Sequence, residues 1–232
     1  MADKSLGLTD RRWLKLALEL MLQPATYLHE SWYETLPNGE LIRRLRNEPA
    51  ATALVNRQLR DILALDLESP PHEFSGWRAR LALLEGPALA QLSLYLGLAL
   101  RSAALRNELL GARLRRLRET LGNEAFTFAL KRTPFLGAIP DFPFEPQDDD
   151  PGIRFSLIGA RFSILQVAQL SEALARRMVL KLPRNWAEDI SPQSNSDVLD
   201  NTPGERQDDA HLPPLLRKLI KERLPTWSPL FA

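Results

Sequence analysis

One stretch of the sequence, residues 92–100 (LSLYLGLAL), limits the possible folds more than any other. Its leucines alternate with other residues as in a β-strand, but leucine is not β-branched and the flanking residues favour helices. Two apolar stripes at helical spacing run through it, one of Leu89, Leu92, Leu96, Ala99 and Ala103 and the other of Leu94, Leu98 and Leu105. A helix that is apolar on two faces is buried on both, so we predict a central helix within an all-α fold.

The composition is that of an ordinary globular protein and sets few further limits. The 232 residues are 44% hydrophobic and 25% charged, which suits one irregular multi-helix domain over residues 1–232, or two small lobes. The absence of cysteine excludes disulfides, thiolate catalysis and cysteine-based metal sites. Residues 92–100 are the longest uncharged apolar run and reach about half of the ~20 residues that a membrane-spanning helix needs. We therefore expect no direct insertion into a membrane.

Apolar periodicity and helix-breaking residues divide the rest of the chain into further helices. The predicted helices run from Thr9 or Asp10 to Pro24, over residues 39–47, over residues 50–67, between residues 77 and 132 with breaks at Gly86, Gly111 and Gly122, over residues 155–182, and from Pro213 or Pro214 to Pro225. The aromatic-dense segment 24–37 lies between the first two of these. We expect its Tyr27 and Trp32 to be structural anchors.

Two acidic segments are predicted to be long, mobile loops. Residues 133–152 contain five prolines and five carboxylates, which prevent a regular helix or strand. Residues 189–211 are polar and poor in large apolar side chains, so burial there would offset little of the entropic cost of ordering.

No arrangement of residues indicates catalysis or a metal site. His29, His72 and His211 lie far apart in the sequence, and no HExxH, GxSxG, GxxxxGK[ST] or GxGxxG motif occurs. Residues 148–150 and Glu145 are acidic, but they lack the alternating ligands and central glycine of a calcium loop. We expect no cofactor, no metal and no enzymatic activity.

The basic region, residues 101–118 (RSAALRNELLGARLRRLR), has six arginines and one glutamate. Such a segment could grip phosphates, which makes a small helical nucleic-acid-binding protein the alternative function. However, it lacks interleaved aromatic residues, and its leucines recur at helical spacing, as on the outer face of packed helices. The preferred interpretation is a cationic face that steers a protein partner and binds no nucleic acid, formed by Arg113, Arg115, Arg116 and Arg118.

The chain ends in residues 212–232 (LPPLLRKLIKERLPTWSPLFA), where large apolar residues stand close to the terminus. An apolar stripe on the closing helix must be covered, and a helix this short is unstable alone. We favour its folding back onto the rest of the chain over docking into another molecule. We predict that Trp227 is a buried anchor, whereas Leu230 and Phe231 lie near the surface and contribute to an interface.

Four blocks of the sequence, taken in order, resemble one known family. They are PATYLHESW (24–32), LGLALRSAALRNELL (96–110), ALARRMVLKLP (173–183) and KLIKERLPTWSPLFA (218–232). Together they resemble the SctK (YscK) family of type III secretion. The resemblance implies a helical, non-catalytic cytoplasmic adaptor of the sorting platform, peripheral to the membrane-associated secretion machine. It further implies two partners, the SctQ-type pod or C-ring protein and the cytoplasmic domain of the SctD-type inner-membrane ring protein.

Overall fold

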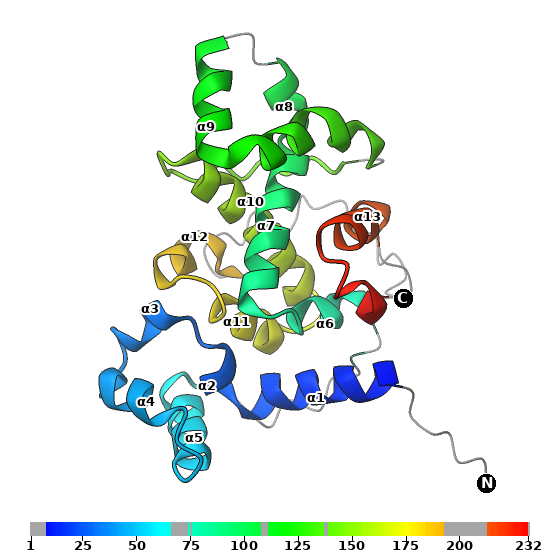
Figure 1. The fold of residues 1–232 in the computed structure, drawn as a ribbon. Coiled ribbons are helices and arrows are strands. Elements are labelled where there is room, and N and C mark those ends of the chain that lie inside the picture. The colour runs from blue at the N-terminus through cyan, green and yellow to red at the C-terminus, as the bar shows by residue number, and fades with distance from the viewer. Residues whose placement is uncertain are drawn as a thin grey trace, which may run out of the picture.

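A computed structural model describes residues 8–65, 74, 76–107, 111–136, 139–192 and 213–231, with the backbone alone for residues 8–11, 112 and 113 (Figure 1). Every regular element in these ranges is a helix, which confirms the all-α class. The α-helices are α1 (Leu8–Leu22), α2 (Pro24–Tyr27), α3 (Glu30–Tyr33), α4 (Gly39–Leu45), α5 (Thr52–Ile62), α6 (Trp77–Ala82), α7 (Gly86–Leu100), α8 (Ser102–Asn107), α9 (Gly111–Thr127), α10 (Pro151–Ala168), α11 (Glu172–Val179), α12 (Ala187–Ile190) and α13 (Pro214–Arg223). A π-helical turn at Phe128–Arg132 and 3-10 turns at Thr133–Phe135, Arg184–Trp186 and Ser228–Phe231 complete the set.

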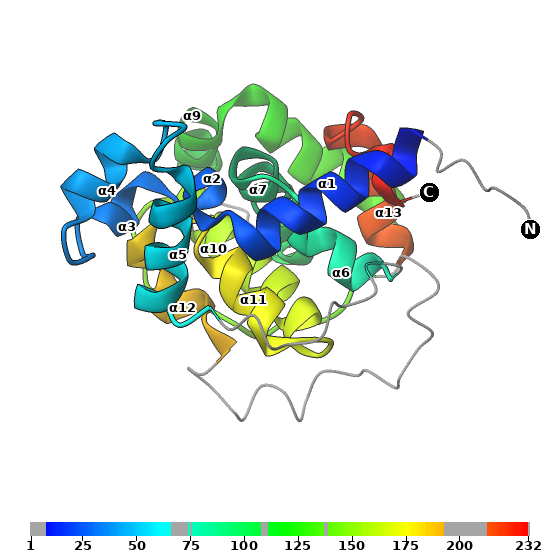
Figure 2. The same ribbon diagram turned by 90° about the horizontal axis from the view of Figure 1, so that it is seen from below.

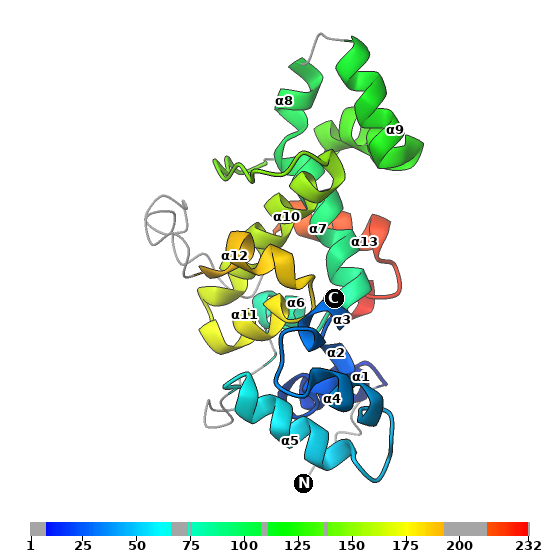
Figure 3. The same ribbon diagram turned by 90° about the vertical axis from the view of Figure 1, so that its left-hand side faces the viewer.

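The centre of the molecule is the pair of helices α7 and α10, which lie side by side in Figures 1 and 3. The predicted central helix is confirmed, because leucines on both of its stripes are buried in α7. Glycines bring the two backbones into contact. A Cβ on Gly97 would lie 1.8 Å from the carbonyl oxygen of Phe155, and one on Gly159 would lie 1.9 Å from that of Ser93. No other residue type fits at these two positions without separating the helices.

The prediction of one long helix over residues 155–182 is wrong, because the chain forms two helices there. α10 ends at Ala168, and α11 begins after Ser171, whose side-chain oxygen accepts a hydrogen bond from the backbone N–H of Leu174 at 3.3 Å. Serine caps a helix in this way at a typical gain of ~1 kcal/mol. The apolar residues keep their helical spacing across the break, so the sequence pattern does not indicate that a second helix begins at Glu172.

The buried apolar residues form two clusters. The larger surrounds α7 and α10, and the smaller lies among α3, α4 and α5, with Leu28, Val55 and Leu59 in its interior. Tyr27 and Trp32 contact both clusters. The indole N–H of Trp32 also donates to the carbonyl oxygen of Leu182 at 3.0 Å, which ties the N-terminal helices to the chain that follows α11.

The C-terminal helix folds back onto the rest of the chain, as predicted. α13 begins at Pro214 and buries one apolar face, composed of Leu215, Leu216, Leu219, Ile220 and Leu224. Trp227 follows with 7% of its surface exposed, and the guanidinium of Arg12 stacks over its ring at 5.0 Å. Figure 2 shows the start of α1 beside this C-terminal turn.

The first acidic segment has no regular element between residues 139 and 150, but the predicted loop 133–152 is shorter at both ends, because residues 133–135 form a 3-10 turn and α10 begins at Pro151. It is nevertheless attached to the core, because the Phe142 ring is buried and meets the Phe162 ring of α10 edge-on, with centroids 5.5 Å apart. Of the second predicted loop, residues 189–211, the first two belong to α12, and residues 193–211 lie outside the described residues.

Candidate partner-binding surfaces

One end of the molecule is an arm built from α8 and α9, which Figures 1 and 3 show extending beyond the α7–α10 pair. α9 is interrupted at Gly122, whose φ of 77° is readily adopted by glycine. Arg115, Arg116 and Arg118 are exposed on α9, and we call these three residues the cationic arm. The side chain of Arg113, the fourth residue of the predicted face, lies outside the described residues.

Two other arginines of the basic region hold the fold together. The Arg101 guanidinium lies 2.7 Å from the Glu145 carboxylate and donates to the carbonyl oxygen of Phe144 at 2.5 Å. Arg106 donates to the side-chain oxygen of Thr133 at 2.9 Å. The basic region and the first acidic loop, which the sequence presents as separate surfaces, are therefore partly paired with each other.

The cationic arm differs from the arginines that pair within the fold. The Arg118 guanidinium donates to the side-chain oxygen of Asn123, while those of Arg115 and Arg116 form no ion pair with any residue in the described ranges. Arg116 lines a cavity of about 340 Å³ between the arm, α10 and the acidic loop. The apolar lining of that cavity comprises Ala104, Leu105, Leu114, Leu117, Pro151, Phe155 and Ile158. The rest of the lining is charged, with Arg101, Glu145, Asp149 and Arg154, so the arm presents positive charge next to a small cavity of mixed character.

The opposite end of the molecule carries an exposed apolar stripe on α1. Leu14, Leu18 and Leu22 follow one another at four-residue spacing and are 42%, 51% and 43% exposed, and we call them the leucine face. Ala17 and Leu20, on the other side of the same helix, are buried in the core. This agrees with the apolar pattern of the sequence, which covers more than one side of the helix.

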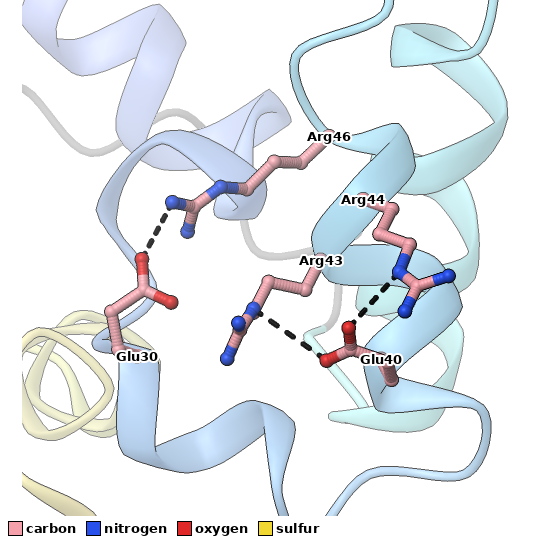
Figure 4. A network of polar contacts seen from close by, with 5 residues as sticks. All are labelled: Glu30, Glu40, Arg43, Arg44 and Arg46. Carbon is pink, nitrogen blue, oxygen red and sulfur yellow. Dashed lines mark hydrogen bonds and ion pairs between the residues drawn. The ribbon is translucent and has the colours of Figure 1, made fainter.

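Charged residues on and next to α3 and α4 are paired among themselves, as Figure 4 shows. The Arg46 guanidinium lies 2.5 Å from the Glu30 carboxylate. The Glu40 carboxylate pairs with two guanidinium groups, that of Arg43 at 3.6 Å and that of Arg44 at 3.0 Å. Three arginines share two carboxylates here, so most of the positive charge of this group is paired within it, unlike that of Arg115 and Arg116.

Lys181 is a buried lysine that joins three segments of the chain. It is not among the anchors or partner-binding residues predicted from the sequence. The Lys181 ammonium donates to the carbonyl oxygens of Ala82 and Leu84 at 2.6 and 2.7 Å, and it lies 5.5 Å from the centre of the Tyr27 ring. Burial lowers the pKa of Lys181 to about 7, against a smaller opposing effect of Glu85. Burial raises the pKa of Tyr27, and Arg177 partly opposes that shift. Both groups are structural in this setting.

The predicted terminal residues differ in where they lie. Leu230 is only 5% exposed, so the expectation that it lies near the surface is wrong. The 3-10 turn Ser228–Phe231 points its side chain inward, and Arg80 holds the turn by donating to the Leu230 carbonyl oxygen at 2.9 Å. Phe231 is partly buried.

The described residues contain no group of three or more side chains suited to a metal ion. His29 caps α3 by accepting a hydrogen bond from the backbone N–H of Ser31, while His72 and His211 lie outside those residues. In the same part of the chain, no helix combines the length and apolar character needed to span a membrane.

Comparison with known proteins assigns the family. The model of the family described as YOP proteins translocation protein K (YscK) matches residues 16–231, which is nearly the whole chain. No curated protein and no solved structure matches the chain. The matched span contains the first three sequence blocks, all but the last residue of the fourth, all of α2 to α13, and the second half of α1 from Leu16 on. The chain therefore belongs to the YscK family of type III secretion proteins.

Proposed function

We propose that this protein is a non-catalytic cytoplasmic adaptor of the type III secretion sorting platform, peripheral to the membrane-associated machine. In this proposal it links the SctD-type inner-membrane ring protein, through the cytoplasmic domain of that protein, to the SctQ-type pod protein. The observation that carries the proposal is the placement of two chemically different surfaces at opposite ends of one helical body. Such an arrangement allows two partners to bind at once without competing.

The two surfaces would act in different ways. The cationic arm would attract an acidic partner and mainly raise the rate of association, because exposed charges steer encounters more than they hold complexes together. The leucine face would bind by burying apolar surface against the partner. The favourable free energy of this burial is proportional to the apolar area removed from water. The α7–α10 contact would keep the distance between the two surfaces fixed.

The experiment is a binding assay with each purified partner. Arg115→Glu combined with Arg116→Glu should slow association with one partner, and Leu14→Ser combined with Leu18→Ser should weaken binding to the other. Arg57→Glu combined with Arg176→Glu is the matched control for charge, because both arginines are exposed, and Leu54→Ser is the control for exposed leucine. Melting temperatures should remain unchanged, because all of these side chains are exposed.

If wild-type protein binds neither the ring protein nor the pod protein, the proposed function is wrong. The alternative outcome is that the protein binds duplex DNA, with an affinity that falls steeply with salt concentration. If Arg115→Glu combined with Arg116→Glu abolishes that binding, the basic region is a nucleic-acid-binding site.

A further inference from the structure

A third surface surrounds Phe135, which is 74% exposed. Its position is fixed by buried neighbours on both sides, because Thr133 and Leu136 are both buried. The side-chain hydroxyl of Thr133 donates to the carbonyl oxygen of Ala129 at 2.7 Å and accepts from Arg106. The preceding turn, Phe128–Arg132, is a π-helix, an uncommon element that occurs frequently at functional sites. The ring of Phe135 is therefore held out of the core by the ordered backbone around it.

Positive side chains from two distant parts of the sequence gather beside this ring. A groove of about 450 Å³ is lined by Arg132, Phe135, Leu136, Lys218, Lys221 and Glu222, and we call it the Phe135 groove. The Lys218 ammonium donates to the backbone carbonyl oxygen of Phe135 at 2.5 Å, so α13 and the 3-10 turn are directly joined. The one carboxylate in the lining, Glu222, lies 3.5 Å from Arg223. The groove thus has an excess of positive charge around an exposed aromatic ring.

We infer that the Phe135 groove binds an acidic segment of a protein partner. An apolar side chain of that segment would pack against the Phe135 ring, and its carboxylates would pair with Arg132, Lys218 and Lys221. Aromatic residues and arginines contribute most of the binding energy in many protein interfaces, and complementary charge sets partner choice. The inference rests on the proposed adaptor function, to which it adds a contact site and the chemistry of the segment that occupies it.

The shape and charge of the groove favour a protein segment over other polyanions. A flat anionic membrane would leave the concave floor at Leu136 unfilled, and a single exposed phenylalanine gives little insertion into lipid. A nucleic-acid backbone would bring a phosphate close to the Glu222 carboxylate, and successive bases would need several stacking rings. A peptide can place its carboxylates away from Glu222 and still fill the groove with one apolar side chain.

The test uses the full chain with the purified ring-protein cytoplasmic domain and pod protein as probes. Phe135→Ser and Lys218→Glu should each raise the Kd for one of these partners by at least ~10-fold, a change typical of an interface anchor. The matched controls are Leu170→Ser for an exposed apolar residue and Arg176→Glu for an exposed cation, and both should leave the Kd unchanged. Melting temperatures of Phe135→Ser, Leu170→Ser and Arg176→Glu should equal that of the wild type, because the altered side chains are exposed. Lys218→Glu should melt ~2 to 4 °C lower, because its side chain no longer donates to the Phe135 carbonyl oxygen, and the protein should remain folded.

A photo-crosslinking amino acid at position 135 identifies the occupant in the same complexes. We expect the crosslinked peptide to come from the partner and to be rich in aspartate and glutamate. A crosslink to a neutral or basic segment would overturn the inference, as would Kd values for Phe135→Ser and Lys218→Glu that match the controls while wild-type protein still binds its partners. In either case the proposed adaptor function would stand. Phe135-dependent binding only to vesicles containing anionic lipid, or only to DNA, would also overturn the inference.

Discussion

Replacing Gly159 with alanine tests the close contact between α7 and α10. In the wild-type structure, a Cβ at this position would lie 1.9 Å from the carbonyl oxygen of Ser93 and 2.8 Å from the backbone nitrogen of Gly97. Both obstructing atoms belong to the backbone of α7, so no side-chain rotation can relieve the overlap. The helices must move apart, or α10 must bend.

The size of the effect follows from this geometry. Ordinary van der Waals contact begins near 3.4 Å, so the 1.9 Å approach to Ser93 requires a local separation of about 1.5 Å. Overpacking of a core usually costs ~1 to 3 kcal/mol, and the gap opened beside the buried leucines of α7 removes dispersion contacts as well. The better helix propensity of alanine returns ~1 kcal/mol. The lost dispersion contacts roughly offset that gain, so we expect a net loss of about 1 to 3 kcal/mol in the free energy of unfolding, or about 2 to 12 °C in melting temperature.

Urea unfolding followed by circular dichroism measures this loss directly. Gly111→Ala is the matched control, because a Cβ there meets no other atom within 4 Å and its stability should change by less than ~1 kcal/mol. Gly97→Ala should resemble Gly159→Ala, since its Cβ would lie 1.8 Å from the Phe155 carbonyl oxygen. A Gly159→Ala protein as stable as the wild type, or more stable, would refute the close contact.

Two further predictions concern the C-terminus and the buried lysine. Trp227→Ala should lower the free energy of unfolding by ~3 to 5 kcal/mol in urea titrations, because the ring is 7% exposed, and Phe231→Ala should lower it less. The pKa of Lys181 is about 7 in the folded protein, so the unfolded chain binds more protons above pH 7. Stability from this group therefore rises with pH from about 7 toward the unfolded pKa of ~10.4, by ~1.4 kcal/mol per pH unit. Lys181→Met should flatten that rise in urea titrations at pH 7, 8 and 9.

Local pattern was sufficient to predict the main helices of the fold. The two stripes of α7 and the single stripe of α13 are periodicities within one helix, and burial follows from them directly. The break between α10 and α11 was missed because Leu170 and Ser171 interrupt the backbone without interrupting the apolar spacing. Leu230 was misplaced for a related reason. Whether a terminal side chain points inward depends on a distant partner, here Arg80, 150 residues away.

Contacts made by tertiary structure also change which charges are available to a partner. The sequence presents residues 101–118 as one basic surface, but Arg101 is paired with Glu145 of the acidic loop, which removes it from that surface. In the opposite sense, Lys218 and Phe135 are 83 residues apart in the sequence, yet their contact helps to form the Phe135 groove. A run of arginines therefore overstates the cationic surface where the fold supplies internal carboxylates. Scattered cations become a surface where helices from distant segments meet around an exposed ring. For an adaptor, the surfaces that matter are those left unpaired after folding, and these can be identified only once the long-range contacts are known.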